Sequence, residues 1–539
     1  MAAEPANIPD DYYLTNFQLF LGFVADQYDD LLNAEEKSFL EHWFSLGDEP
    51  RKLYVRLISR KGQFFRADKL SYEEIDRLDF AAQQLADQRL LVINPALTVN
   101  ELAGLLTKPE LVKQFRTHLN GHQSKKKSEL VSILVDQNIT VPELPFIVYK
   151  PEFTLEITSF KFLFFGNLYQ NLTEFVLSDL GITQYEKYPL NKQNRLFKNR
   201  EQMEEALALS EVAAIAAEAE YNRDTGTLIS LVDEIPAKPD QSLMLRRYSR
   251  LINRVARELE RQQSYSSALE LFQQSSMPPA RERMARILDK KSENQAAIRV
   301  CQQIIEQPFS DMELAFAQRF ISKFNGEKPR RNRRQYPEVY IALAESDQRV
   351  ELIALDYYQQ QGWQAFYAEN SLISGLAGLY FWDVIFADIK DAFFHPFQSA
   401  PADLMTNDFY QKRSLQIKER IIEINQNSFK SKVIKTYRDK QGIANRLVHW
   451  SVLTEEMITL ACDLIPEEHF KAVFGKLMFD IAHNRTGFPD LILFKPETGE
   501  YRWSEVKGPG DKLQENQKRW LDFFTGKDIP FEVLYVEWG

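Results

Sequence analysis

The chain has 539 residues, too many for one hydrophobic core, which predicts about three or four domains. A formal charge of −11 excludes a protein that coats nucleic acid nonspecifically, so any contact with DNA must use local basic patches. The only cysteines, Cys301 and Cys462, exclude a cysteine-rich zinc finger and indicate a reducing compartment without a disulfide framework.

The start of the chain and its most apolar stretch both indicate an intracellular protein that does not enter membranes. Residues 1–10 lack the basic and apolar regions of a signal peptide. Residues 372–389 are interrupted by Asp383 and Asp388, so they predict buried core rather than a membrane span.

The first 95 residues predict a helical domain. Leu40, Trp43 and Phe44 follow the spacing of one helix face, and Leu53 and Leu57 repeat it. This region shows no candidate catalytic residues, and we interpret it as a packing or DNA-flanking helical domain.

Residues 96–145 predict a small DNA-binding module. Two helices, expected at 110–119 and 128–135, flank a loop with a basic cluster, and Ser128 is the expected N-cap of the second helix. The cluster consists of Lys125, Lys126 and Lys127. Lysines at a helix start can hold DNA phosphates, and the arrangement resembles a SAP module. A solvated charge run is the alternative, and both interpretations stay open.

Residues 146–335 predict a helical region with the texture of tetratricopeptide-like repeats and a basic face. One helix carries arginines at spacings of three and four: Arg247, Arg250, Arg254, Arg257 and Arg261. Arg250 and Arg254, with Arg281 and Arg283 further along, are candidates for binding DNA phosphates. The alternative is a salt-bridged solvent face paired with neighbouring glutamates. A basic linker, residues 328–337, precedes the last domain.

The strongest signal is a predicted hairpin in the last domain, residues 336–539. Asp490 opens a buried strand, residues 496–500 form a turn, and residues 501–507 form a second strand. If the hairpin is symmetric, Asp490 and Glu505 face each other with Cβ atoms about 5 Å apart. Lys507 then lies on the same face as Glu505.

Two adjacent carboxylates repel each other unless a cation lies between them, which predicts a Mg²⁺ or Mn²⁺ site. The backbone carbonyl of Val506 could add a further oxygen ligand. Such an ion would offset charge on a phosphodiester, while Lys507 would position or help deprotonate the attacking water. The residues alone therefore predict metal-dependent phosphodiester hydrolysis.

The residues Asp490…Glu505-Val506-Lys507 match the PD-(D/E)xK nuclease pattern. With Gly487-Phe488-Pro489-Asp490 and the upstream Glu369-Asn370-Ser371, residues 350–539 resemble the VRR-NUC branch, and more closely the Fanconi-anaemia-associated nuclease family. The resemblance implies a multidomain fold: helical N-terminal and repeat regions, then an α/β nuclease domain with a mixed central sheet.

The same resemblance implies further site residues and an activity. Glu369, on a helix before the sheet, would complete the metal site, and Gln517 would support Lys507 or the water on the metal. Arg281, Arg283 and Arg485 would hold a 5′ phosphate. Family members cut DNA near 5′ flaps, trim 5′ to 3′ and act in interstrand-crosslink repair, so branched or flapped DNA is the expected partner.

One departure from the family is the lack of any cysteine before Cys301, where eukaryotic members carry a ubiquitin-binding zinc finger. We therefore expect no ubiquitin-binding finger and a bacterial, cytoplasmic protein acting on DNA as a monomer or weak dimer; a eukaryotic member would be nuclear. A Holliday-junction resolvase and a non-catalytic DNA-binding scaffold are the alternatives.

Overall fold

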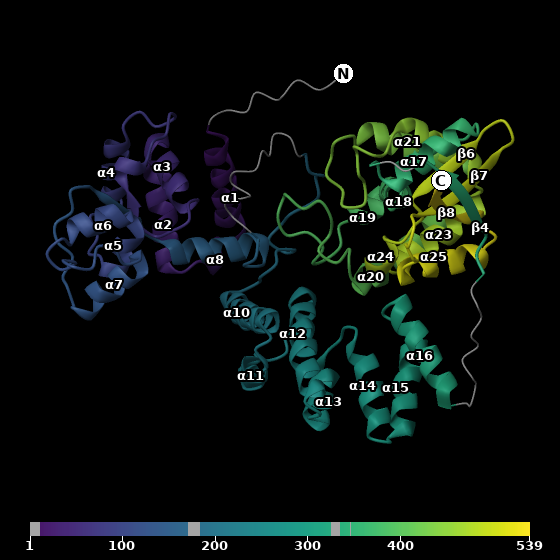
Figure 1. Ribbon diagram of the computed structural model, residues 1–539, viewed down its shortest axis with the longest axis horizontal. Helices are drawn as coiled ribbons and strands as arrows, with labels where there is room; N and C mark the ends of the chain where they lie inside the picture. Colours follow the sequence, from purple (N-terminus) through teal and green to yellow (C-terminus); the bar gives the residue numbers. More distant parts are fainter. Residues whose placement is uncertain (1–10, 171–183, 325–334, 345–346) are drawn as a thin grey trace. The chain divides into compact units, whose positions relative to one another are not determined.

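The computed structural model describes residues 11–170, 184–324, 335–344 and 347–539 (Figure 1). The chain forms two compact units, one of residues 1–182 with 191–204 and the other of residues 183–190 with 205–539. Most of the predicted basic linker, residues 328–334, lies outside the described residues.

The first unit contains helices and one small sheet. Its elements are α1 (Tyr12–Tyr28), η1 (Asp29–Leu31), α2 (Ala34–Ser45), α3 (Asp48–Ile58), β1 (Phe65–Arg66), η2 (Ala67–Lys69), α4 (Leu78–Asp87), β2 (Leu91–Ile93), α5 (Val99–Leu105), α6 (Lys108–Gln114), α7 (Lys127–Asp136), β3 (Val148–Pro151) and α8 (Thr154–Phe165). The three strands form an antiparallel sheet in the order β1-β3-β2. The sequence did not predict this sheet, because strands of two to four residues show too little alternation.

The helices α5, α6 and α7 pack around their own small core, which includes Leu102, Leu111 and Leu130. The expectation that Ser128 caps the last of these helices is wrong. The helix begins at Lys127, and its N-cap is Lys126, whose backbone N–H donates to the Glu129 carboxylate at 2.8 Å. The Glu129 side chain, three residues after the observed cap, therefore stabilises a helix start two residues earlier than a Ser128 cap would.

The second unit begins with helices that pack one against the next, as Figure 1 shows for α12 to α16. These elements are α10 (Arg200–Asn222), in which the boundary between the units falls, α11 (Thr225–Ser230), η3 (Leu231–Glu234), α12 (Ser242–Arg261), α13 (Tyr265–Gln274), α14 (Ala280–Lys290), α15 (Asn294–Glu306) and α16 (Asp311–Phe324). The prediction of a helical region before the α/β domain is confirmed, and its tetratricopeptide-like repeat character stays a prediction.

The remaining elements of the second unit build the α/β domain. They are β4 (Glu338–Leu343), α17 (Val350–Gln360), β5 (Gln364–Tyr367), α18 (Ser371–Tyr380), α19 (Trp382–Ile385), α20 (Asn407–Ile422), α21 (Gln426–Asp439), α22 (Glu455–Leu464), α23 (Glu467–Phe479), α24 (Ile481–Asn484), β6 (Leu491–Lys495), β7 (Glu500–Lys507), α25 (Glu515–Thr525) and β8 (Phe531–Trp538).

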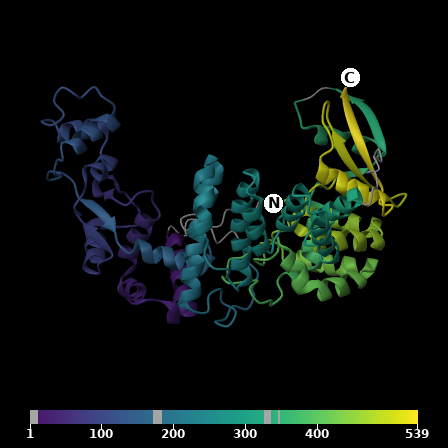
Figure 2. The same cartoon turned by 90° about the horizontal axis from the view of Figure 1, so that it is seen from below.

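The five strands form one mixed sheet in the order β4-β8-β7-β6-β5. The strand β8 is parallel to both β4 and β7, whereas β6 is antiparallel to β5 and β7. Figure 2 shows the teal β4 strand beside the yellow strands from the end of the chain. A mixed central sheet is therefore confirmed.

Both faces of this sheet are covered, because successive side chains of each strand point to opposite sides. On one face, Ala354 and Tyr358 of α17 share a core with Leu491 and Val506. On the other face, the α25 side chains pack among Ile492 and Trp503. Asp490 is two residues before Ile492, and Glu505 is two residues after Trp503. Both acids therefore lie on the face of the sheet that α25 covers.

None of the helices in the described ranges combines the length and the apolar composition that a membrane span requires.

Candidate active site

The hairpin of β6 and β7 has the register that the sequence predicts. Leu491 pairs with Ser504 and Lys495 pairs with Glu500, so the next pair outward is Asp490 opposite Glu505. The turn between the strands includes Gly499, whose φ of +74° favours glycine. Symmetry about this turn brings the two carboxylates to neighbouring positions on one face.

Glu505 is completely buried, and its two carboxylate oxygens have different surroundings. Its Oε1 accepts hydrogen bonds from Lys507 Nζ at 2.7 Å and from Gln517 Nε2 at 2.6 Å. Its Oε2 is buried without a hydrogen-bond partner among the described residues. Burial, with the nearby charge of Asp490, raises the pKa of Glu505 to about 8.

Asp490 joins the hairpin to the turn that carries Glu369. Its Oδ2 accepts the backbone N–H of Val506 at 2.9 Å, and its carbonyl accepts the N–H groups of Ala368 and Glu369 at 3.0 and 2.9 Å. Burial raises the pKa of Asp490 to about 6, although the Val506 N–H and the Lys507 charge act in the opposite direction. Both acids are therefore harder to ionise than they would be in water, and a nearby cation would favour their ionised forms.

Glu369 lies in the turn between β5 and α18 with a φ of +34°, so the expectation that it lies on a helix before the sheet is wrong. The short strand β5 precedes it, and the carbonyl of Asp490 holds the turn by two hydrogen bonds. Its carboxylate accepts hydrogen bonds from Tyr367 Oη at 2.7 Å and Asn370 Nδ2 at 2.9 Å. The Glu369 charge is close enough to raise the pKa of both Asp490 and Glu505.

Tyr367 is a site residue that the sequence did not single out. It also accepts a hydrogen bond from Arg349 Nη2 at 3.0 Å. Its position two residues before Glu369, at the end of a strand, is the only signal that could have indicated it. Asn370 makes two hydrogen bonds at the site. Its Nδ2 donates to Glu369, and its Oδ1 accepts the backbone N–H of Phe488 at 3.2 Å.

The donor set fits a divalent cation with hard oxygen ligands. Asp490 and Glu505 offer carboxylate oxygens, and no donor of the described residues bonds the buried Oε2 of Glu505. Across the described ranges, no group of three or more His, Cys, Asp or Glu side chains is arranged to hold a metal. Glu369 is therefore a nearby third acid whose oxygens are engaged by Tyr367 and Asn370.

The arginines predicted to hold a phosphate are paired with glutamates. Arg281 makes a two-pronged ion pair with Glu313, at 2.9 and 2.6 Å, and Arg283 pairs with Glu260. The pair of Arg283 with Glu260 agrees with the salt-bridged alternative that the sequence left open, whereas the pairing of Arg281 with Glu313 was not expected. Phosphate binding by Arg281 and Arg283 stays a prediction, and it would require these ion pairs to open.

The other predicted DNA-binding residues differ in their exposure and in whether they form ion pairs. Arg254 pairs with Glu220 at 2.6 Å, whereas Arg250, on the same helix, is exposed and pairs with no carboxylate of the described residues. Arg485 is exposed and lies two residues before Gly487, in the loop that leads to Asp490. In the first unit, Lys125 and Lys126 are exposed and Lys127 is partly buried at the start of α7.

Three family models match the chain in the order of its regions. A FAN1 HTH domain matches residues 11–92, and a Fanconi anemia-associated nuclease SAP domain matches residues 96–140. A VRR-NUC domain matches residues 424–538, which include Asp490, Glu505, Lys507 and Gln517. Glu369 lies outside that match.

Curated relatives match nearly the whole chain. A Fanconi-associated nuclease 1 homolog of Pseudomonas aeruginosa is 34% identical over 550 residues, covering 99% of this chain and 97% of the relative. Fanconi-associated nuclease 1 of Homo sapiens is 24% identical over 640 residues, covering 97% of this chain and 62% of the human protein.

Solved structures agree with this match. The crystal structure of paFAN1 bound to 2nt 5′ flap DNA with gap has a TM-score of 0.81 at 34% identity, covering 99% of this chain and 100% of that chain. The complex with 1nt 5′ flap DNA with gap has a TM-score of 0.79 at 33% identity, covering 98% and 100% of the two chains. With its facing acid pair, its mixed sheet and this near-complete match, the chain belongs to the Fanconi-associated nuclease 1 family.

Proposed function

We propose that the protein cleaves DNA near 5′ flaps and trims it 5′ to 3′ with Mg²⁺ or Mn²⁺, in the repair of interstrand crosslinks. The observation that carries this proposal is the register that places Asp490 opposite Glu505, with Lys507 Nζ 2.7 Å from Glu505 Oε1. The flap preference is inferred from paFAN1, which was crystallised with 5′ flap DNA.

Asp490, Glu505 and the carbonyl of Val506 would hold the divalent ion, and Glu369 would join them after leaving Tyr367 or Asn370. The chemistry that the ion supplies when bound is Lewis-acid stabilisation of charge at the phosphodiester. Glu505 Oε2 supports this assignment, because a buried acceptor without a donor is costly unless a cation contacts it.

Lys507 would orient the attacking water and help to deprotonate it. Its side chain is 9% exposed and its ammonium group contacts Glu505, so its position is fixed before substrate arrives. A buried cation here also favours the extra negative charge of the transition state. Gln517 would hold Glu505 Oε1, leaving Oε2 for the metal.

The test compares cleavage and binding of a 5′-phosphorylated flap by the wild type and by Asp490→Ala and Lys507→Ala variants. We expect each variant to lose Mg²⁺-dependent cleavage by at least about a thousandfold, while flap affinity stays within about threefold. A matched control is Lys527→Ala, an exposed lysine after α25, which should cut normally.

Unchanged cutting by Asp490→Ala or Lys507→Ala would refute the site. The same assay with 3′-flap and four-way-junction DNA tests the substrate: faster cutting of the junction than of the 5′ flap would favour a junction resolvase. Binding without cleavage by the wild type, with either ion, would favour a non-catalytic scaffold.

A further inference from the structure

Of the acids near the proposed metal site, two are held by groups of the sheet itself. Asp490 Oδ2 accepts the backbone N–H of Val506 at 2.9 Å, and Glu505 Oε1 contacts Lys507 Nζ at 2.7 Å. Glu369 is the third acid, and among the residues that the structure describes the three are not arranged to hold a metal together. Glu369 can therefore join the other two only if its carboxylate moves.

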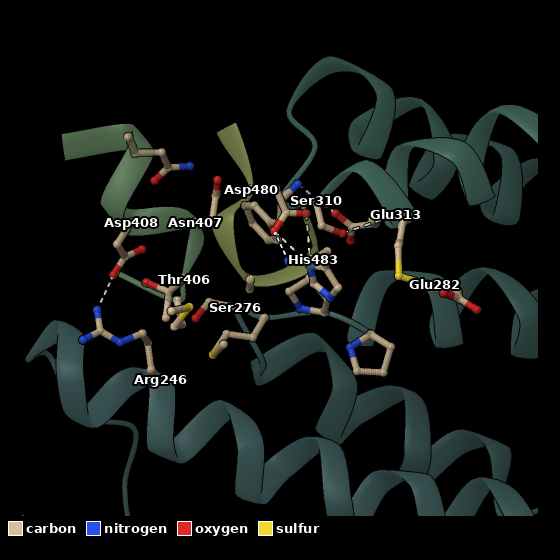
Figure 3. Close-up of a pocket in the computed structure, with 18 of the residues that line it drawn as sticks. Arg246, Ser276, Glu282, Ser310, Glu313, Thr406, Asn407, Asp408, Asp480 and His483 are labelled. Atoms are coloured by element: carbon tan, nitrogen blue, oxygen red, sulfur yellow. Dashed lines mark hydrogen bonds and ion pairs between the residues drawn. The ribbon is translucent and has the colours of Figure 1, made fainter. Parts of the chain in front are cut away.

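The loop between α24 and β6, which leads into the hairpin, is held at its start and near its end. At its start, Asp480 caps α24, and its Oδ1 contacts His483 Nδ1 at 2.9 Å, as Figure 3 shows. Near its end, the backbone N–H of Phe488 donates to Asn370 Oδ1 at 3.2 Å. Movement at the site is thus left to the side chain of Glu369.

The two oxygens of the Glu369 carboxylate have different donors. Tyr367 Oη donates to Oε2 at 2.7 Å, and Asn370 Nδ2 donates to Oε1 at 2.9 Å. The backbone of Glu369 is fixed next to the hairpin, because its N–H donates to the carbonyl of Asp490 at 2.9 Å. Rotation about the side-chain bonds can therefore bring the carboxylate to the acid pair once one donor releases it.

The two donors also differ in what holds them. Asn370 is bonded to the backbone of Phe488, which is 1% exposed, so it stays in place. Tyr367 Oη accepts a hydrogen bond from Arg349 Nη2 at 3.0 Å, and the Arg349 side chain is 60% exposed and pairs with Glu351 at 3.3 Å. Because Tyr367 is only partly buried, water can replace the carboxylate at its hydroxyl. The bond from Tyr367 is therefore the less costly of the two to break.

Arg349 strengthens the hydrogen bond that Tyr367 donates. A hydroxyl that accepts a hydrogen bond from a cation is a stronger donor, because both bonds polarise the O–H group in the same direction. The Arg349 guanidinium carbon also lies 5.0 Å from the centroid of the Tyr367 ring, which adds a cation–π contact. Metal binding at Glu369 must therefore compete with a reinforced O–H donor.

We propose that Tyr367, reinforced by Arg349, is a positioning residue that keeps Glu369 away from the acid pair until a divalent ion binds there. The inference rests on the proposed function, because it assigns what controls the third acid of that site. On metal binding, Oε2 leaves the tyrosine hydroxyl, while Asn370 stays on Oε1 and orients the carboxylate. In the protein without metal, the third acid is kept apart from two carboxylates that it would repel.

The first test measures the affinity of the full-length protein for Mn²⁺ without DNA, from the free Mn²⁺ signal in electron paramagnetic resonance titrations at pH 8. Tyr367→Phe removes only the hydroxyl, so metal binding no longer has to break its hydrogen bond to Glu369. We expect this variant to bind Mn²⁺ about threefold to tenfold more tightly than the wild type. Equal or weaker binding by Tyr367→Phe overturns the proposal.

Two further variants test the residues on either side of the tyrosine. In a Glu369→Gln background, Tyr367→Phe should leave Mn²⁺ affinity unchanged, because the acid that it releases is missing. Arg349→Lys keeps the positive charge but loses the rigid donor geometry, so it should tighten Mn²⁺ binding about twofold. Tightening by Tyr367→Phe that persists in the Glu369→Gln background would contradict the assignment.

The matched control is Tyr357→Phe, which removes a hydroxyl from α17 on the opposite face of the sheet and should bind Mn²⁺ as the wild type does. Asn370→Ala should weaken Mn²⁺ binding, so that the two donors to Glu369 respond with opposite signs. General destabilisation would not tighten metal binding, and tightening by Asn370→Ala as well would reject the choice of Tyr367. Melting curves in EDTA check that every variant folds.

Glu505→Gln separates a failure of this inference from a failure of the proposed function. If Glu505→Gln loses the Mn²⁺ binding of the wild type, the metal site stands, and an unchanged affinity of Tyr367→Phe rejects only the role of Tyr367. If Glu505→Gln binds Mn²⁺ like the wild type, the ion lies elsewhere and both proposals fail.

Discussion

Because the carboxylate of Glu505 is buried, the stability of the folded protein should depend on whether a cation is bound beside it. Its Oε2 has no partner among the described residues, and burial raises its pKa to about 8, so the ionised form is held at an energetic cost. A cation that binds only the folded protein recovers this cost.

We therefore expect Mn²⁺ at pH 8 to raise the melting temperature of the wild type by a few degrees above that in EDTA. Glu505→Gln removes the charge and keeps the shape, so Mn²⁺ should leave its melting temperature unchanged. Scanning fluorimetry with and without Mn²⁺ measures both. An equal rise in the two proteins would show that the ion binds elsewhere.

Gln517 is a positioning residue, because it acts on the site through Glu505 Oε1 at 2.6 Å. We expect Gln517→Ala to lower the cleavage rate about tenfold and to raise the Mn²⁺ concentration needed for half-maximal rate. A merely structural role would lower the melting temperature without moving this metal midpoint. The exposed Lys527→Ala variant again serves as the reference.

Some residues of the site could be predicted from the sequence, and others could not. Asp490 and Glu505 were predictable because pairing across a short turn depends only on counting residues from its centre. The hydrogen bonds of Tyr367 and Asn370 to Glu369 depend on a turn with positive φ, which no local pattern reveals.

At the scale of elements, Gly487 sets the distance between the loop before Asp490 and the helix α25. Its φ is +94°, and a Cβ there would lie 2.7 Å from the backbone carbon of Asn516. The close approach brings the start of α25, and with it Gln517, against the loop. Only glycine satisfies both the conformation and the contact.

Gly487→Ala should therefore destabilise the protein by roughly 2 kcal/mol and reduce cleavage, because the loop and α25 must move apart. Gly499→Ala is the matched control: its φ is +74°, but a Cβ would meet nothing within 4 Å. The Gly499→Ala variant therefore has the strain of a positive φ but no steric clash between the new Cβ and a neighbouring residue. Denaturant unfolding of both variants measures the difference, and equal losses would mean that the contact is unimportant.

The long helices and the β6–β7 hairpin were predictable because periodicity accumulates over many residues. The strand β5 was not, because its four residues fall between two helices and gain their partner only from β6. The partners of the arginines in α12 and α14 could not be predicted for a different reason. Sequence alone could not decide between phosphate and glutamate partners, since Arg283 reaches Glu260 on another helix.

At the scale of the whole molecule, a buried histidine makes the second unit sensitive to acid. His395 is 4% exposed, and burial lowers its pKa to about 3. Its carbonyl accepts a hydrogen bond from the Tyr188 hydroxyl at 2.7 Å, which anchors residues 184–190 to this unit. Because the folded pKa is depressed, the neutral form stabilises the fold above the unfolded value of 6.5, and this contribution is lost as pH falls below it.

We expect the wild type to lose about 2 kcal/mol of stability from this group between pH 7.5 and 5. His395→Gln, which cannot be protonated, should be less sensitive over the same range. His449→Gln, at an exposed position of the same unit, should follow the wild type. Urea unfolding at the two pH values measures this, and parallel losses in all three proteins would assign the acid sensitivity to other groups.

The order of the mixed sheet has a consequence for synthesis of the protein on the ribosome. The strand β8 lies between β4 and β7, and it is formed by residues 531–538, almost two hundred positions after β4 begins. Until those last residues emerge, the strand carrying Glu505 and Lys507 has β6 as its only neighbour in the sheet. A nascent or prematurely terminated chain therefore lacks the support that holds its acids and lysine in place, and DNA-cutting activity arises only after the tail has docked.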